Sequence, residues 1–215
     1  SGFLLEKGWH RRLVARDIKT YRISRSEHEP PLSTEEVRRL VSAINLNGRN
    51  GHRDLAILQL FLQCGLRVSE LVHLSRDDVI IHKTVARLRV RSEKGREERT
   101  IPLNKTARQA IEDYIERRGP VAGSDPLFVS ERGRRISVPS VQYLVKKYLC
   151  FAGREDLSTH DLRHHFALRF YAQSGKLTAT QKVLGHSDIN TTARYAKTLD
   201  EEILRSIDAL DDRPE

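Results

Sequence analysis

The 215-residue sequence contains no methionine, only two cysteines and few aromatic residues. Two cysteines are too few for a disulfide framework, so a reducing compartment is expected, with Cys64 and Cys150 both in the core. No apolar run approaches the roughly twenty residues that cross a bilayer, and no charged leader precedes an apolar stretch. We therefore predict neither a membrane partner nor export. The opening Ser1 and Gly2, without methionine, are typical of a fragment of a longer protein.

Positive charge is abundant. Lysine and arginine outnumber aspartate and glutamate by 38 to 29, which gives a formal net charge of +9 and a pI near 9.8. Such an excess attracts polyanions, and it favours nucleic acid as the partner. A generally basic protein without such a partner fits the charge equally well, so the motifs must decide.

The apolar pattern predicts a mainly α-helical domain with one small antiparallel β-sheet. Residues 1–31 are expected to hold the end of a helix and a polar linker that closes in two prolines, and the globular domain spans residues 32–215. Its first helix can be capped by Ser33 or Thr34, and an apolar helix over 52–63 ends at Gly65. Strands are expected at 79–82, 85–91 and 99–103, and further helices at 105–118, 138–151, 160–173, 178–184, 188–197 and 200–210.

Two segments near the predicted sheet carry candidate phosphate-binding cations. In GLRVSEL, Arg67 follows closely on the glycine that ends an apolar helix, so its guanidinium can project from a rigid position where Glu70 holds it. Lys94 lies in the charged turn before Gly95, from which a flexible lysine can reach a ligand over the sheet. Taken singly, a surface salt bridge and a solvated lysine are the more ordinary interpretations.

The segment HDLRHH offers a pair of side chains suited to a phosphate. His160 and Arg163 are three positions apart and share one helix face, so they combine a group that titrates near neutral pH with a permanent positive charge. His160 and His164 also have the i, i+4 spacing of a zinc helix. No glutamate lies between them and Arg163 would repel a cation, so no metal site is predicted.

The fourth segment, LGHSDINTTARYAK, contains His186 directly after Gly185, and Tyr195 nine positions later. Alone, Tyr195 would be interpreted as a half-buried packing residue. Together the four segments resemble the tyrosine recombinase, or phage integrase, family, with its boxes G-L-R-x-S-E-L, H-x-L-R-H and L-G-H-x-x-x-x-T-T-x-x-Y in the same order and spacing. The resemblance spans roughly residues 32–197.

This resemblance implies the family's catalytic domain, with its DNA breaking-rejoining fold and with residues 1–31 as a remnant of the preceding core-binding domain and linker. It assigns catalytic roles to Arg67, Lys94, His160, Arg163, His186 and the nucleophile Tyr195, and a supporting role to Glu70. By the same resemblance the two arginines hold the non-bridging oxygens, His160 accepts the tyrosine proton, Lys94 protonates the leaving oxygen and His186 steadies the phosphate. Two positions depart from the family pattern: His165, where serine or threonine is frequent, and Cys64, where a small hydroxyl residue or glycine is frequent.

The implied function is site-specific recombination through a 3′-phosphotyrosyl intermediate and a Holliday junction, with no ATP, metal or other cofactor. The implied partners are double-stranded DNA, a homotetramer assembled on it, and accessory DNA-bending or directionality proteins, in the cytoplasm of a prokaryote or on its mobile elements. Arg96, Lys146 and Lys147 are further candidate phosphate contacts, with simple solvation as the alternative. The helix over 200–210 is expected either to pack on its own domain or to dock into a neighbour. A type IB topoisomerase and a non-cutting DNA-binding module are the alternative functions.

Overall fold

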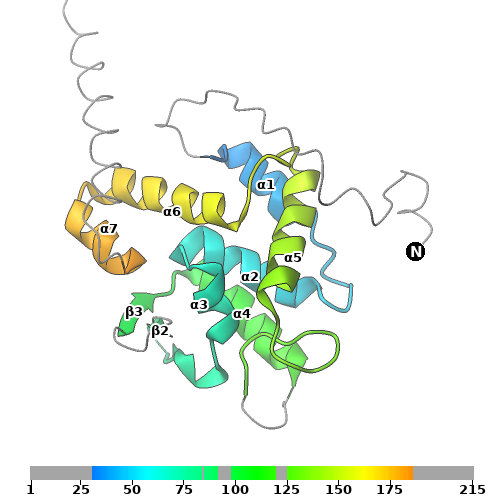
Figure 1. The fold of residues 1–215 in the computed structure, drawn as a ribbon. Coiled ribbons are helices and arrows are strands. Elements are labelled where there is room, and N and C mark those ends of the chain that lie inside the picture. The colour runs from blue at the N-terminus through cyan, green and yellow to red at the C-terminus, as the bar shows by residue number, and fades with distance from the viewer. Residues whose placement is uncertain (1–30, 84, 92–97, 120–124, 186–215) are drawn as a thin grey trace, which may run out of the picture.

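The computed structural model describes residues 31–83, 85–91, 98–119 and 125–185, and the following account refers to these residues. They form seven α-helices, one 3₁₀ turn and a three-stranded antiparallel sheet, which confirms the expected fold class. In Figure 1, α2 (Gly51–Cys64) lies in the middle, below α6 (Thr159–Ser174) and beside α5 (Val138–Phe151), and the sheet lies at the lower left. Helix α2 also packs along α4 (Lys105–Arg118).

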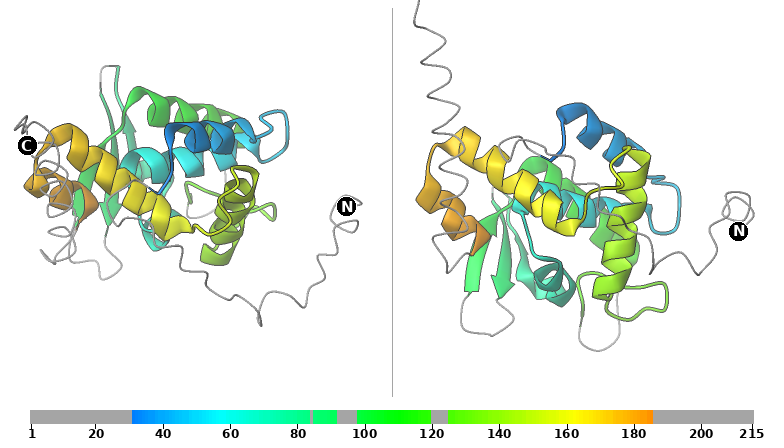
Figure 2. Two further views of the ribbon diagram at one scale, coloured as in Figure 1. Left: turned by 90° about the horizontal axis from the view of Figure 1, so that it is seen from above. Right: turned by 45° about the horizontal axis from the view of Figure 1, so that its top comes forward.

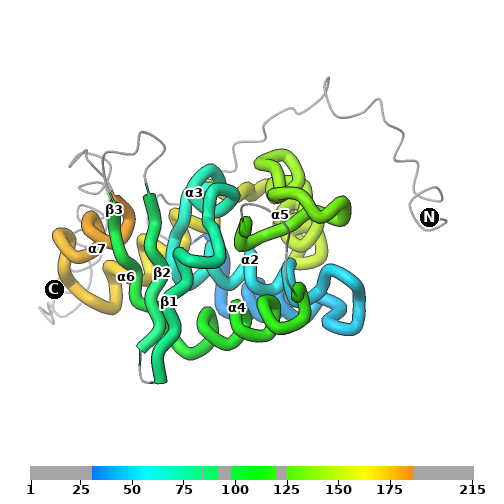
Figure 3. Tube along the Cα trace, turned by 90° about the horizontal axis from the view of Figure 1, so that it is seen from below, coloured from blue at the N-terminus to red at the C-terminus, as the bar shows by residue number. Residues whose placement is uncertain are grey.

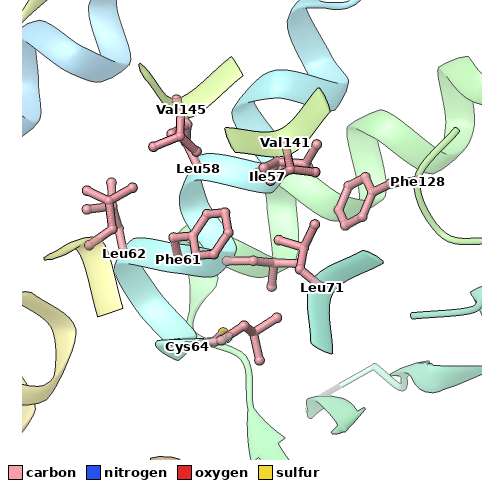
Figure 4. Close-up of a cluster of buried hydrophobic side chains, with 14 of the residues drawn as sticks. Ile57, Leu58, Phe61, Leu62, Cys64, Leu71, Phe128, Val141 and Val145 are labelled. Carbon is pink, nitrogen blue, oxygen red and sulfur yellow. The ribbon is translucent and has the colours of Figure 1, made fainter. Parts of the chain in front are cut away.

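The hydrophobic core is built around α2, which is apolar on nearly every face over its second half. Such a helix is stable only when neighbours cover it on all sides. Figure 4 shows the resulting cluster, in which side chains of α2 meet those of α5, of the following helix and of the loop before α5. The α2 members Ile57, Leu58, Phe61 and Leu62 are at most 1% exposed. Helix α2 is therefore a fixed support for the residues that follow its C-terminus.

The helix starts follow from capping chemistry. Helix α1 (Thr34–Ser42) begins after Ser33, whose hydroxyl accepts from the Glu36 amide at 3.2 Å while the Glu36 carboxylate accepts from the Ser33 amide at 2.7 Å. The expected ranges of α4 and α5 are confirmed, and α6 and α7 (Leu177–Leu184) each start one residue earlier than predicted. Helix α3 (Val68–His73) was not predicted as a helix, because six residues are too few to establish a helical period.

The sheet has the strand order β1 (Val79–Ile81), β2 (Ala86–Arg91), β3 (Glu98–Pro102), and it follows the 3₁₀ turn η1 (Arg76–Asp78). Leu88 pairs with Ile101 across β2 and β3, and both side chains are buried at the core face. Figure 3 shows the three strands side by side, with β3 at the edge next to α7, and Figure 2 shows α7 following α6 on the same side of the molecule. This arrangement brings β3 against the end of α7.

The two cysteines differ in burial. The placement of Cys150 in the core was wrong: it is exposed on α5, where its thiol donates to Glu155 Oε1 at 3.0 Å. Cys64 is buried as expected, and neither cysteine forms a disulfide. Cys150 follows the buried Leu149 on α5 and lies on the outward side of that helix. The N-terminal helix end and linker over 1–30, and the predicted helices over 188–197 and 200–210, lie outside the described residues. Among the helices that are described, none has the length and apolarity to cross a bilayer.

Candidate active site

Arg67 is positioned by the end of α2 and the start of α3. Its backbone amide donates to Glu70 Oε2 at 2.7 Å and its Nη1 donates to Glu70 Oε1 at 3.0 Å, so the expected pairing with Glu70 is present. Its Nη2 lies 3.5 Å from the carbonyl oxygen of Gly185. The side chain remains 45% exposed. Arg67 is thus held along one edge and open to solvent along the other.

Glu70 is the buried acceptor on which this cluster converges, with a side chain only 2% exposed. Arg99 donates from Nη1 to Oε1 at 2.8 Å and from Nη2 to Oε2 at 2.9 Å, and Nη1 of Arg163 lies 3.6 Å from Oε2. Burial alone would raise the pKa of Glu70. The hydrogen bonds and charge of Arg99, the amide of Arg67 and the charge of Arg163 outweigh burial, so the pKa lies below its usual value. The carboxylate therefore stays ionised among three arginines.

Arg163 lies on α6 and is buried, with a side chain 7% exposed. Its Nη1 donates to the carbonyl oxygen of Gly65 at 2.6 Å and its Nη2 to that of Leu184 at 2.7 Å. Gly65 ends α2 with φ +61°, and a Cβ there would lie 2.2 Å from Cδ1 of Phe166, so only glycine fits. These bonds fix the plane of the Arg163 guanidinium between the ends of α2 and α7.

His160 lies one turn before Arg163, in the first turn of α6, and is exposed. Ser158 caps this helix: its hydroxyl accepts from the His160 amide at 3.3 Å, and its own amide donates to Asp161 at 2.9 Å. Two residues beyond Arg163, His165 is 2% exposed and neither ring nitrogen has a hydrogen-bond partner among the described atoms. Burial, with the charges of Arg169 and His164, lowers the pKa of His165 to about 4, so the ring is neutral near pH 7.

The remaining expected catalytic residues, Lys94, His186 and Tyr195, lie outside the described residues, as does Arg96. Within the described ranges, no group of three or more His, Cys, Asp or Glu side chains is arranged to hold a metal ion. Cys64, the second departure from the family pattern, is fully buried at the end of α2, as Figure 4 shows. Burial raises the pKa of its thiol to about 12, although the charge of Arg99 opposes this, so it remains protonated.

The two lysines expected to contact DNA lie next to each other on the exposed side of α5 and have different surroundings. The Lys146 ammonium donates to the carbonyl oxygen of Glu155 and, at 3.4 Å, to that of Leu157. The Lys147 ammonium lies 4.8 Å from the ring centroid of Tyr148. Lys147 also lines a surface cavity of about 740 Å³ whose walls carry four arginines: Arg53, Arg132, Arg134 and Arg135.

Sequence reasoning missed Arg99, whose guanidinium donates to both carboxylate oxygens of Glu70. Its strand was predicted, but the residue was not singled out. A signal was present: in a strand, residues two apart face the same side, and Arg99 is two positions before the buried Ile101. A charged residue on the core-facing side of a strand requires a buried partner.

Comparisons with known proteins place these residues in a family context. A model of the phage integrase family matches residues 31–202. The tyrosine recombinase XerC of Caldanaerobacter subterraneus subsp. tengcongensis is 40% identical over 185 residues, which cover 84% of this chain and 50% of that protein. The tyrosine recombinase XerA of Thermococcus kodakarensis is 37% identical over 178 residues, which cover 81% and 60% of the two chains. The chain therefore spans about half the length of the first of these relatives.

Solved structures show the same fold. The XerH site-specific recombinase bound to palindromic difH substrate, a post-cleavage complex, matches with a TM-score of 0.73 at 22% identity, covering 86% of this chain and 54% of that one. The XerA recombinase matches with a TM-score of 0.68 at 27% identity, covering 86% and 65%. At its low identity, the XerH likeness concerns the fold alone.

Proposed function

The chain belongs to the phage integrase family, and we propose that it is the catalytic domain of a site-specific DNA recombinase whose Tyr195 forms a covalent bond to a DNA phosphate. The observation that carries this proposal is the convergence of Arg67 and Arg163 on the buried carboxylate of Glu70. An ionised acid held in this way fixes two guanidinium groups beside one another, with Arg67 still 45% exposed. The names of the relatives and the ordered motifs support the same assignment.

The arginines suit the charge that develops during cleavage. When a nucleophile adds to phosphorus, negative charge accumulates on the non-bridging oxygens, and cations that are already in place stabilise it without reorganisation. In the proposal, Arg67 and Arg163 donate to these oxygens. A guanidinium can donate a forked pair of hydrogen bonds that lysine cannot reproduce. Loss of either arginine should lower the cleavage rate on the order of 10³-fold, as for other phosphoryl-stabilising arginines.

Bond making and breaking are assigned to the other residues of the family motifs. The Tyr195 oxygen bonds to phosphorus as the bond to the 5′ oxygen breaks. A free tyrosine has a pKa of about 10, so its proton needs an acceptor. The proposed acceptor is His160, which is exposed in the first turn of α6. Lys94 supplies a proton to the leaving 5′ oxygen, and His186 donates a hydrogen bond to the phosphate.

The proposed intermediate, a 3′-phosphotyrosyl bond, retains the energy of the phosphodiester that was cut. A 5′ hydroxyl from another strand can therefore reverse the reaction and complete strand exchange through a Holliday junction. Neither ATP nor a metal ion has a role in this scheme. The cations come from the protein.

DNA contacts outside the reacting phosphate are proposed for the basic cavity on α5 and for the β2–β3 turn. Lys147 is the stronger candidate of the two α5 lysines, because the Lys146 ammonium already donates to two backbone carbonyls. Arg96 is proposed as a phosphate contact from the turn. Each neutralised phosphate in duplex DNA contributes about 0.9 to the slope of log affinity against log salt. The number of phosphate contacts can therefore be measured from the salt dependence of DNA binding.

The proposed assembly is a homotetramer on two DNA sites, formed in the cytoplasm of a prokaryote on its chromosome or on a mobile element. Such an assembly pairs two duplexes, each carrying two protomers. The helix expected over 200–210 would join neighbouring protomers or cover its own domain. Accessory DNA-bending or directionality proteins remain candidate partners.

The function is tested by covalent capture. The chain is incubated with a library of duplexes cut from the DNA of the encoding organism and carrying single-strand nicks. A cut made close to a nick releases a short strand that diffuses away, which prevents rejoining. Protein-linked DNA that survives denaturant is then recovered and sequenced, and the enriched duplex serves as the substrate for all later assays.

Two variants make the result specific. Tyr195→Phe should give no adduct at any protein concentration. Tyr143→Phe removes the hydroxyl of an exposed tyrosine that lines the α5 cavity, and it should still give the adduct when the protein saturates the duplex. Insensitivity to EDTA is expected. If the chain binds the enriched duplex but never becomes linked to it, the non-cutting DNA-binding module replaces the recombinase as the better account.

A further inference from the structure

Arg99 joins three separate elements of the site. It lies on β3, donates through both terminal nitrogens to Glu70 on α3, and donates from Nε to the carbonyl oxygen of Val183 on α7 at 2.7 Å. Its side chain is only 13% exposed. A cation buried to this extent is not solvated by water and needs partners in the protein, so its contacts determine how these elements meet.

The end of α7 is held by three arginines in succession. The carbonyl oxygens of Val183, Leu184 and Gly185 accept from Arg99, Arg163 and Arg67, at 2.7, 2.7 and 3.5 Å. The last carbonyls of a helix have no partner within the helix and carry its partial negative charge, so cations stabilise this end. All three arginines also lie within 3.6 Å of a Glu70 oxygen.

Arg99 also lies against the glycine that ends α7. Gly185 has φ +63°, and a Cβ built on it would lie 2.7 Å from Nη1 of Arg99. The chain passes directly over the guanidinium at this point, and the next residue along it is His186. A shift of Arg99 therefore changes the point from which the segment with His186 and Tyr195 continues.

From these contacts we infer that Arg99 is a positioning residue for strand cleavage, acting through Glu70 and through the end of α7. It holds the Glu70 carboxylate ionised and oriented, which in turn orients Arg67. Its Nε fixes the last turn of α7, from which the nucleophile segment continues. The catalytic consequence of this inference rests on the proposed function. The contacts of Arg99 with Glu70 and Val183, which we call the clamp on α7, are seen in the structure itself.

The first test measures adduct formation in a single turnover on the captured duplex, with protein in excess and at saturation. Arg99→Gln should slow adduct formation about 100-fold, the loss typical of reacting groups displaced by about 1 Å. Arg99→Lys keeps the charge beside Glu70 and should recover at least about ten-fold of that loss. Arg89→Gln is the matched control, because Arg89 on the neighbouring strand also pairs with a buried carboxylate, Asp78, at 3.1 Å, away from the cluster. It should react within about three-fold of the unchanged chain.

The second readout is the pH dependence, which a general loss of stability would not shift in the same way. Without Arg99, burial still raises the pKa of Glu70 but its largest opposing group is gone. Glu70 is then protonated at a higher pH, and the acid side of the rate profile of Arg99→Gln moves upward. The profile of Arg99→Lys should stay near that of the unchanged chain. Identical profiles for all three proteins would contradict the role assigned to Glu70.

The third readout does not depend on activity. Hydrogen exchange of the Gly185 amide, which donates to the Gln181 carbonyl at 2.9 Å, reports whether the end of α7 is held. Exchange there should rise at least about ten-fold in Arg99→Gln relative to α4 amides, and should not rise in Arg89→Gln. Unchanged exchange refutes the clamp even if the adduct forms. Absence of adduct from the unchanged chain refutes the proposed function and leaves the clamp to be decided by exchange.

Discussion

Replacing Glu70 with glutamine removes one negative charge from among three arginines while keeping the side chain's size. Breaking a buried ion pair from one side typically costs about 3–5 kcal/mol. Glutamine still offers one carbonyl oxygen to the Arg99 fork, and the Arg67 guanidinium is 45% exposed and can be solvated. We therefore expect the lower end, about 3 kcal/mol of unfolding free energy. At a urea m value of about 2 kcal/mol/M, the unfolding midpoint falls by roughly 1.5 M.

The loss should also depend on pH in a defined direction. Arginine contacts hold the pKa of Glu70 below its usual value of 4.5, so the folded protein binds this proton less readily than the unfolded chain. The contribution is fully present above about pH 4.5 and is lost as the pH falls through the lower, folded-state pKa. The stability difference between the unchanged chain and Glu70→Gln should therefore be constant near neutral pH and shrink in acid.

Asp78→Asn separates stability from catalysis. Asp78 is 3% exposed and pairs with two arginines, Arg89 at 3.1 Å and Arg91 at 3.2 Å, so it is a comparable buried carboxylate outside the site. Both variants should lower the urea midpoint, but only Glu70→Gln should also slow adduct formation under conditions where the protein is folded. Equal midpoints and equal rates for Glu70→Gln and the unchanged chain would refute the reasoning.

Three further outcomes follow from individual contacts. Gly65→Ala should lower the unfolding free energy, measured by urea unfolding, on the order of 3 kcal/mol. The reason is that its methyl group would lie 2.2 Å from Phe166, at a φ of +61°. Phe166→Leu in the same chain should restore part of that loss. His165, with a pKa of about 4, stays neutral in the folded protein but takes up a proton in the unfolded chain below about pH 6.5. The unfolding free energy of the unchanged chain should therefore fall by about 2 kcal/mol between pH 7 and pH 5, and that of His165→Leu should not show this fall. Lys147→Gln should lower the salt slope of DNA binding by about 0.9 with no change in the saturated adduct rate, whereas an equal effect from Lys146→Gln would contradict the distinction drawn between the two lysines.

The fold was largely predictable because its signals are local. The apolar run of α2, the capping serine before α1 and the alternation in β2 and β3 each fix an element within a few residues of sequence. The fold class and the ranges of α4 and α5 were confirmed on this basis. Helix α3 was missed because its six residues are too few to show a helical period. Its start is marked instead by the Glu70 carboxylate, which accepts from the Arg67 amide.

The site was predictable only where a motif marks it. Arg67 and Glu70 belong to one sequence motif and Arg163 belongs to the next, and the structure brings the three side chains together. Arg99 lies 29 positions from Glu70, and no spacing rule connects a strand residue to a helix that far away. Its pairing with Glu70 follows from the way β3 and α3 meet in the fold, which is a tertiary property. The fate of Cys150 likewise depended on which side of α5 faces the core.

The central claim is tested most directly by locating the DNA on the protein. The captured adduct is digested with nuclease and trypsin, and the linked peptide is sequenced by mass spectrometry. The account predicts a nucleotide attached through its 3′ phosphate to the oxygen of Tyr195, and a free 5′ hydroxyl on the released strand. A nucleotide attached to any other residue, or through a 5′ phosphate, would contradict it.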